Sequence, residues 1–175
     1  VDIYEKIVAL YNLPNSYIKE LLEEFIHIDI SNISLFPDVT DTLIQLKVQG
    51  YKLILVTSGE KEIQGKKINV LGLSGGYFDD IVVADSNGSQ IKKGCFQEVM
   101  RRYNLKPEEI MCIGDKIDDE LTAGKSLGIT TVMFEHGRHY EAYLREPHKC
   151  IKPDYSIKHI KDMLELRIAN CSQIT

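Results

Sequence analysis

The chain has 175 residues and a formal net charge of −5, from 26 acidic and 21 basic side chains. Hydrophobic residues make up 43% of it, which is enough for one domain to bury a core. The acidic excess argues against a general nucleic-acid-binding protein, which usually presents a basic face. No apolar run approaches the length of a membrane span, and the opening segment VDIYEKIVALYNL is amphipathic and contains acids, unlike a signal peptide. We therefore expect no nucleic-acid partner and no membrane partner.

The cysteines form neither a CxxC pair nor a metal-like cluster with the histidines, and they stand at Cys95, Cys112, Cys150 and Cys171. Cys112 lies inside an apolar run. We interpret the cysteines as reduced thiols, which predicts a cytoplasmic protein.

The N-terminal part of the chain is predicted to be helical. Helical patterns at residues 3–11 and 17–26 are separated at Pro14, which favours two short helices. After a connection, the stretch DVTDTLIQLKV predicts a third helix, with Asp38 as its N-cap and Gly50 at its end.

From residue 52 onward, short continuous apolar runs alternate with helical patterns. The apolar runs are KLILV, IVVA, IMCI and TTVMF, and the helical patterns between them are EIQGKKINVLGL, CFQEVMRRYN and ELTAGKSLG. Continuous apolar runs suit strands that are buried on both faces of a parallel sheet. The alternation therefore predicts a Rossmann-like, doubly wound α/β domain with a mostly parallel sheet. The stretch DYSIKHIKDMLELRIA adds a short strand and a final helix.

Ligands of such a sheet bind beyond the carboxyl ends of its strands. The run KLILV leads into Thr57, Ser58 and Gly59, where a hydroxyl and the backbone at a helix start can donate hydrogen bonds to an anion. An ordinary turn with a helix cap has the same residues, so this stretch alone does not decide between the two interpretations.

A second strand end carries acids. The run IMCI leads into Gly114 and Asp115, and further acids follow at Asp118, Asp119 and Glu120. Clustered carboxylates repel one another unless a cation is present, and Mg²⁺ prefers one or two protein carboxylates together with water and substrate phosphate. Acids are also stabilised at a helix N-terminus, so the spacing alone leaves a metal site and a solvated helix start equally open.

Taken together, these segments are similar to the haloacid dehalogenase-like (HAD) phosphohydrolase superfamily. The similarity runs in order through KLILVTSG, EIQGKKINVLGLSGGYFDDIVVA and IKKGCFQEVMRRYNLKPEEIMCIGDKIDDELTAGKSLGITTVMF, and it looks closest to members with a small helical cap inserted early in the chain. The resemblance implies a helical cap remnant at residues 1–33 and a HAD-like α/β core at 34–175. It also implies Mg²⁺-dependent hydrolysis of phosphate monoesters, with a small phosphorylated molecule as the substrate.

The resemblance further implies a role for each strand end. Thr57 matches the hydroxyl residue that binds the transferring phosphoryl oxygen, with Ser58 and Gly59 beside it as substrate-binding residues. The family's lysine neutralises the phosphate and the attacking carboxylate. It should lie before the helix CFQEVM, where Lys92 fits by its distance to Gly114 and Lys93 fits as part of a Lys-Gly pair.

For the metal, the resemblance implies that Asp115 binds Mg²⁺. The second acid stays open. Asp119 fits a spacing of three residues between the acids, and Glu120 fits a longer spacing when AGKSLG sets the register. The loop FEHGRHY adds His136, Arg138 and His139, which either reach a substrate anion or form a polar surface loop.

One part of the family pattern is missing. The first family motif is a strand that ends in Asp-x-Asp, in which the first Asp is the nucleophile and the second is the general acid and base. This sequence contains no Asp-x-Asp. The chain therefore reads as though its first segment had been removed, and the resemblance places the missing strand between KLILV and IMCI. A truncated phosphatase and a non-catalytic HAD-fold structural or binding module of a longer protein are the two hypotheses.

Three sources could fill the gap. Residues 25–30 could form the strand, which would make Asp29 the nucleophile and place Ser31 where the second Asp belongs, although serine cannot serve as a comparable acid. Alternatively, a second chain completes the sheet, or a preceding part of the protein supplies the strand.

Overall fold

The computed structural model describes residues 2–84, 88–147 and 150–166. Its helices are α1 (Asp2–Leu10), α2 (Tyr17–Ile26), α3 (Val39–Val48), α4 (Lys61–Val70), α5 (Ser89–Tyr103), α6 (Thr122–Leu127) and α7 (Gly137–Arg145). Its strands are β1 (Ile54–Ser58), β2 (Asp80–Ala84), β3 (Met111–Gly114), β4 (Thr130–Phe134) and β5 (Tyr155–Ile157). Short 3₁₀ segments cover Pro107–Glu109 and Ile160–Glu165, and a π-helical turn covers Ile117–Leu121.

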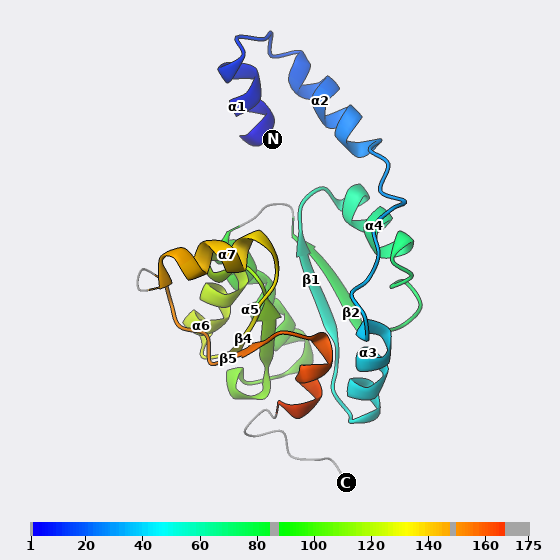
Figure 1. The fold of residues 1–175 in the computed structure, drawn as a ribbon, viewed down its shortest axis with the longest axis vertical. Coiled ribbons are helices and arrows are strands. Elements are labelled where there is room, and N and C mark those ends of the chain that lie inside the picture. The colour runs from blue at the N-terminus through cyan, green and yellow to red at the C-terminus, as the bar shows by residue number, and fades with distance from the viewer. Residues whose placement is uncertain (1, 85–87, 148–149, 167–175) are drawn as a thin grey trace.

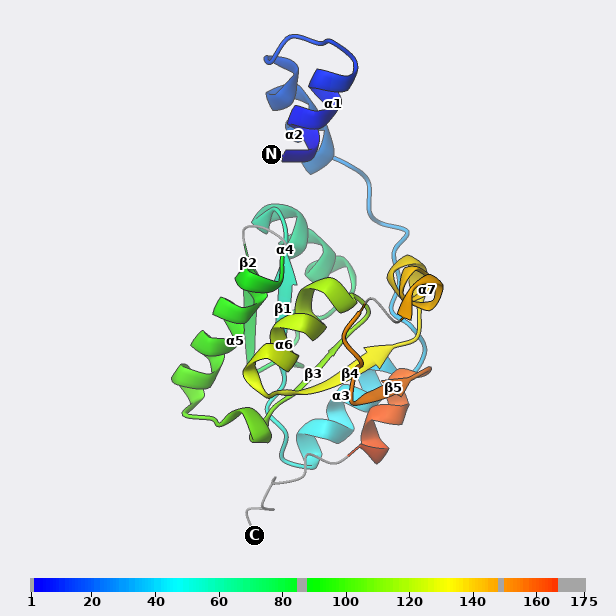
Figure 2. The same cartoon turned by 90° about the vertical axis from the view of Figure 1, so that its left-hand side faces the viewer.

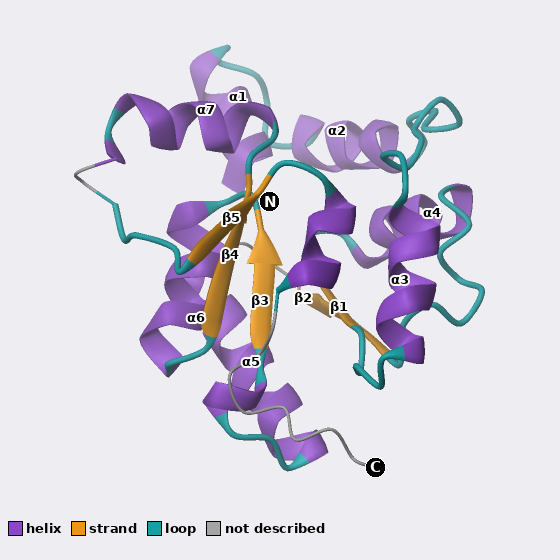
Figure 3. Cartoon of the chain, turned by 60° about the horizontal axis from the view of Figure 1, so that its bottom comes forward, coloured by secondary structure: helices purple, strands orange, loops and turns teal. Residues whose placement is uncertain are grey.

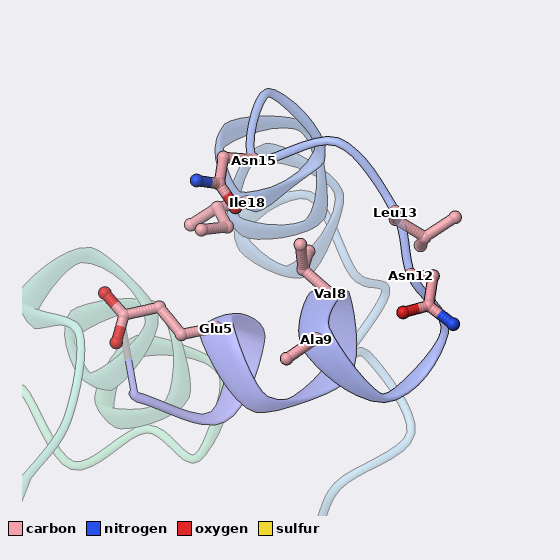
Figure 4. A pocket seen from close by; sticks show the side chains of 7 residues that line it. All are labelled: Glu5, Val8, Ala9, Asn12, Leu13, Asn15 and Ile18. Atoms are coloured by element: carbon pink, nitrogen blue, oxygen red, sulfur yellow. The ribbon is translucent and has the colours of Figure 1, made fainter.

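The helices α1 and α2 form a hairpin that stands apart from the α/β core, to which residues 27–38 connect it (Figures 1 and 2). The predicted break at Pro14 is confirmed, because it lies between the two helices. The hairpin buries little: Val8 is 3% exposed, but α2 has no buried residue and Leu10 is 74% exposed. A pocket between the two helices is lined by Glu5, Val8, Ala9, Asn12, Leu13, Asn15 and Ile18, away from the sheet (Figure 4).

The strands form two separate parallel sheets (Figure 3). In the first, β1 pairs with β2, and Thr57 lies opposite Val83. In the second, β4 lies between β3 and β5. Among the described residues β1 and β3 do not pair with each other. The α/β fold with parallel strands is therefore confirmed, and the interruption lies between the two strands where the resemblance puts the missing one.

The core lies around β4 and the turn that precedes α6. Leu121, Val132 and Met133 are fully buried, and Ile129 is 2% exposed. Gly124 lets α6 approach the sheet closely, because a Cβ atom at this position would lie 3.2 Å from Thr131 Cγ2. Close packing of this kind holds the acidic turn between β3 and α6 in a defined place.

Two predicted boundaries moved, and both changes concern the candidate site. β1 runs on through Thr57 and Ser58, so these residues end the strand and do not follow it. α5 begins at Ser89, so Lys92 and Lys93 lie within its first two turns and not before the helix. Polar residues extend both elements: Thr57 and Ser58 continue the apolar strand β1, and Ser89 and Gln90 begin the helix α5.

Three further predictions about elements had different outcomes. Asp38 is the N-cap residue of α3, as predicted, but it has a φ of +65° and its side chain makes no capping hydrogen bond. The stretch 134–140 was predicted as a loop, but α7 begins within it at Gly137. Residues 160–165 form a 3₁₀ segment, and the rest of the predicted final helix, like Cys171, lies outside the described residues. Within the described part of the chain, no helix is both long and apolar enough to cross a membrane.

Candidate active site

The hydroxyl of Thr57 lies at the end of β1 and is held by the helix that follows. Its Oγ1 donates a hydrogen bond to Gln64 Oε1 at 3.1 Å. Gly59 has a φ of +123°, a conformation that glycine adopts readily, and its N–H donates to the Ala84 carbonyl at 2.9 Å. This bond ties the end of β1 to the end of β2 and engages the Gly59 N–H within the protein.

Ser58 differs from its neighbour. Consecutive side chains of a strand point to opposite faces, so a ligand that meets the Thr57 hydroxyl meets Ser58 through the backbone. The Ser58 Oγ is buried and has no hydrogen-bond partner among the described residues.

Lys92 links α5 to the end of β1. It is 6% exposed, and its ammonium donates to the Val56 carbonyl at 3.2 Å, one residue before Thr57. Burial raises the pKa of Glu120 in the acidic turn after β3, and the positive charge of Lys92 opposes that rise. Lys93 is more exposed, and its side chain makes no hydrogen bond or ion pair with another described residue. One buried cation therefore lies between the carboxyl end of β1 and the acids that follow β3.

The acids after β3 differ in environment, and Asp118, Asp119 and Glu120 lie on the π-helical turn. Asp119 is 2% exposed, accepts a hydrogen bond from the Gly88 N–H at 3.2 Å and pairs with Lys116 Nζ at 3.2 Å. Its carboxylate is therefore compensated within the protein. Asp118 is exposed, and Asp115 is half-buried at the end of β3.

Glu120 packs directly over the glycine that ends β3. A Cβ atom at Gly114 would lie 2.5 Å from Glu120 Cγ and 2.7 Å from Cδ, so only glycine leaves room for this side chain. Glu120 Oε1 accepts a hydrogen bond from the Lys116 N–H at 2.8 Å. Burial raises the pKa of Glu120, while the hydrogen bond from Lys116 opposes that shift. A cation beside this carboxylate would offset its burial.

The donor chemistry fits Mg²⁺. Among the residues that the structure describes, no three His, Cys, Asp or Glu side chains are grouped so as to hold a metal ion on their own. Mg²⁺ needs only one or two protein carboxylates, because water and substrate phosphate complete its shell. Asp115 with either Asp119 or Glu120 provides that number of carboxylates.

The segment after β4 borders this site. A Cβ atom at Gly137 would lie 4.0 Å from Asp115 Oδ2, so the start of α7 approaches the candidate metal-binding acid. His136 is exposed, and its ring lies 4.5 Å from that of Phe36. Arg138 is exposed and His139 is half-buried. Contact of His136, Arg138 or His139 with a substrate stays a prediction.

The alternative nucleophile is not placed for catalysis. Residues 27–38 contain no strand, so the interpretation of residues 25–30 as the missing strand is wrong. Asp29 is exposed in the connection to the core, and its carboxylate accepts a hydrogen bond from the Ser31 N–H at 2.8 Å, which lowers its pKa. The helical pattern of α2 runs through Phe25 and ends at Ile26, and this leaves too few residues for a strand.

Sequence reasoning missed Gln64 and Lys116. The sequence around Gln64 contains no motif that marks it as a site residue. Lys116 stands next to the acidic residues and pairs with one of them, Asp119. Both side chains act on candidate residues: Gln64 on Thr57, and Lys116 on Asp119.

Parallel strands with flanking helices, and with the candidate side chains near the ends of β1 and β3, define a Rossmann-like α/β domain. The chain belongs to the haloacid dehalogenase-like hydrolases, because a model of that family matches residues 2–134. It is similar to a glyceraldehyde 3-phosphate phosphatase of Methanopyrus kandleri, with 31% identity over 132 residues, which are 75% of this chain and 55% of that protein. The chain thus spans about half the length of this curated relative.

Solved structures agree on the fold. A HAD phosphatase from Thermococcus onnurineus has a TM-score of 0.62 and 27% identity, and the match covers 92% of this chain and 68% of that one. The HAD hydrolase YfnB from Bacillus subtilis, in a structure bound to magnesium, has a TM-score of 0.59 and 23% identity, with 75% of this chain and 55% of that one covered. The second likeness shows the fold alone.

Proposed function

We propose that the protein is a Mg²⁺-dependent phosphatase that hydrolyses the phosphate monoester of a small molecule. The observation that carries the proposal is the position of Lys92, whose buried ammonium donates to the β1 backbone beside Thr57 from a helix, α5, that packs against the acidic turn after β3. A protein interior accepts a charge at a cost unless the charge is compensated, and a site that receives an anion accounts for a buried cation at this position. A phosphorylated substrate supplies that anion.

In this mechanism each residue stabilises the negative charge of the phosphoryl group or binds the metal ion. The Thr57 hydroxyl donates to a phosphoryl oxygen, and Lys92, as the family's lysine in preference to Lys93, neutralises the charge that builds up on the phosphoryl group. Asp115, with Glu120 or Asp119 as the second acid, would hold Mg²⁺. When bound, Mg²⁺ would supply further electrostatic stabilisation of the phosphoryl oxygens.

Among the described residues, no strand between β1 and β3 carries a carboxylate that could attack phosphorus. The chemistry requires a carboxylate oxygen that attacks phosphorus while the bond to the leaving-group oxygen breaks, followed by hydrolysis of the acyl phosphate by water. We infer that a strand between β1 and β3 carries this carboxylate, from a further segment of the protein or from a second chain. That strand would also pair with the inner edges of both sheets.

The alternative function, a non-catalytic HAD-fold module, is favoured by the lack of an Asp-x-Asp motif in the 175 residues. A cytoplasmic location is part of the main proposal, and it is supported by the free thiols of Cys95, Cys112 and Cys150. The similarity to the glyceraldehyde 3-phosphate phosphatase of Methanopyrus kandleri makes glyceraldehyde 3-phosphate the first substrate to test.

The test compares the product of the complete gene with the 175-residue chain, both with Mg²⁺. The gene product should hydrolyse glyceraldehyde 3-phosphate or p-nitrophenyl phosphate, and Lys92→Met should lower kcat by roughly a hundredfold or more. The 175-residue chain should be no faster than buffer. If the gene product has no phosphatase activity, the non-catalytic module is correct. If the 175-residue chain turns over and Asp29→Asn removes the activity, Asp29 is the nucleophile after all.

A further inference from the structure

A glutamine of α4, Gln64, lies against the end of β1, next to Thr57 and Gly59. Gln64 lies in the first turns of α4, and its Oε1 accepts the Thr57 hydroxyl at 3.1 Å. Its amide nitrogen reaches Gly59, where a Cβ atom would lie 3.0 Å from Gln64 Nε2. Both polar atoms of one side chain therefore lie against Thr57 and Gly59, which the family resemblance assigns to substrate binding.

The two atoms of this amide are used unequally. Oε1 is an acceptor and is engaged by Thr57, whereas Nε2 carries two N–H donors. Nε2 makes no hydrogen bond with any other residue in the described part of the chain. A half-buried amide with one engaged end and one unused donor end is suited to receive an anion.

A single hydroxyl hydrogen cannot serve two acceptors. While Thr57 donates to Gln64, it cannot donate to a phosphoryl oxygen, so phosphate binding has to move that hydrogen bond from Gln64 to the ligand. The unused Nε2 donor lies beside the same hydroxyl and can take a second phosphoryl oxygen as the bond moves.

We propose that Gln64 is a phosphate-binding residue that holds the Thr57 hydroxyl in the empty site and donates from Nε2 to the bound phosphoryl group. This inference rests on the proposed function, because it assigns a second donor to the same site. A role restricted to supporting Thr57 would need only Oε1, and this difference makes the two roles separable.

The test measures the affinity of the complete gene product for inorganic phosphate by calorimetry, with Mg²⁺ present. Gln64→Glu keeps the shape of the side chain and an acceptor for Thr57, but it replaces the donor with a negative oxygen. It should weaken phosphate binding by about tenfold to a hundredfold, as expected for the loss of a charge-assisted hydrogen bond. Gln64→Met, which has neither donor nor charge, should also weaken binding, by less.

Lys61→Gln is the matched control. It changes the charge by the same amount on the same helix, but the Lys61 side chain is exposed and has no hydrogen bond or ion pair with the described residues. Phosphate affinity should change by less than about threefold, because an exposed charge is screened by salt. Thermal unfolding of each variant shows that the fold is kept.

Three outcomes overturn the inference, and they are distinguishable. If both Gln64 variants bind phosphate as the wild type does while Thr57→Val binds more weakly, Gln64 has only a supporting role and the proposed function stands. If Lys61→Gln weakens binding as much as Gln64→Glu, a general charge effect explains the result. If the wild type itself binds no phosphate, both the proposed function and this inference are wrong.

Discussion

The contact between Gly114 and Glu120 can be broken by adding a single carbon atom. In Gly114→Ala the new Cβ would lie 2.5 Å from Glu120 Cγ and 2.7 Å from Cδ, closer than the 3.0 Å that real Cβ atoms essentially never cross. The backbone at Gly114 is not in the left-handed region, so the clash is the whole perturbation. Glu120 has to leave its place, and its hydrogen bond to the Lys116 N–H is lost.

The expected cost follows from that bond. A hydrogen bond to a charged group contributes about 1.5–3 kcal/mol, and the return of a buried carboxylate to water recovers part of this. We therefore expect Gly114→Ala to lower the free energy of unfolding by about 1–3 kcal/mol, or the melting temperature by roughly 2–10 °C. The same variant also reports on the metal. If Glu120 is the second acid that binds the metal, this variant loses the rise in melting temperature with Mg²⁺. If Asp119 is the second acid, the variant keeps that rise.

The assay is thermal unfolding with and without Mg²⁺, and Gly94→Ala is the control. A Cβ atom at Gly94 would have nothing within 4 Å, and the residue lies inside α5. Alanine should stabilise the protein there by up to about 1 kcal/mol, because it is the better helix former. A Gly114→Ala variant as stable as the wild type would refute the packing of Glu120 over the end of β3.

Three further predictions test the candidate residues and their support. Lys92→Met should lower the affinity for inorganic phosphate by at least about tenfold, while Lys93→Met should leave it within about threefold, as measured by calorimetry; the reverse order would make Lys93 the site lysine. Asp115→Asn should abolish the rise in melting temperature with Mg²⁺, and an unchanged rise would mean that the ion binds elsewhere. The pKa of Asp79 is lowered by the hydrogen bond from the Leu53 N–H, so its contribution to stability is present above an unfolded pKa of about 3.9 and is lost as the pH falls through the folded pKa. Asp79→Asn should therefore lower the melting temperature near neutral pH, by an amount that shrinks below about pH 3; a loss that is constant with pH would contradict the linkage.

The fold class could be predicted because the apolar runs and their spacing are strong signals. The position of α7 could not, because its nine residues begin at a glycine with a φ of +76° and read as a polar loop. The start of α5 was also hidden, since Ser89 and Gln90 carry no apolar signal. Short elements with polar ends are stabilised by tertiary packing more than by their own sequence.

The position at which α5 begins decides whether Lys92 or Lys93 points into the protein. With α5 starting at Ser89, Lys92 lies four residues before Phe96 and seven before Val99, and all three side chains are buried. This is one face of a helix, so Lys92 points inward and Lys93 does not. The signal was present in the sequence, but it could be used only after the helix was extended back past CFQEVM.

The burial of β1 bears on the source of the missing nucleophile. Its apolar residues predict a strand that is buried on both faces, yet all five residues of β1 are only half-buried, whereas Val132 and Met133 of β4 are fully buried. Backbone groups on the inner edges of β1 and β3 also lack a neighbouring strand among the described residues. Each buried group left unpaired costs about 1–3 kcal/mol, so a strand inserted between them would be stabilised by both edges. The same strand would place a carboxylate between Thr57 and Asp115, so that completing the sheet and completing the active site become one structural event.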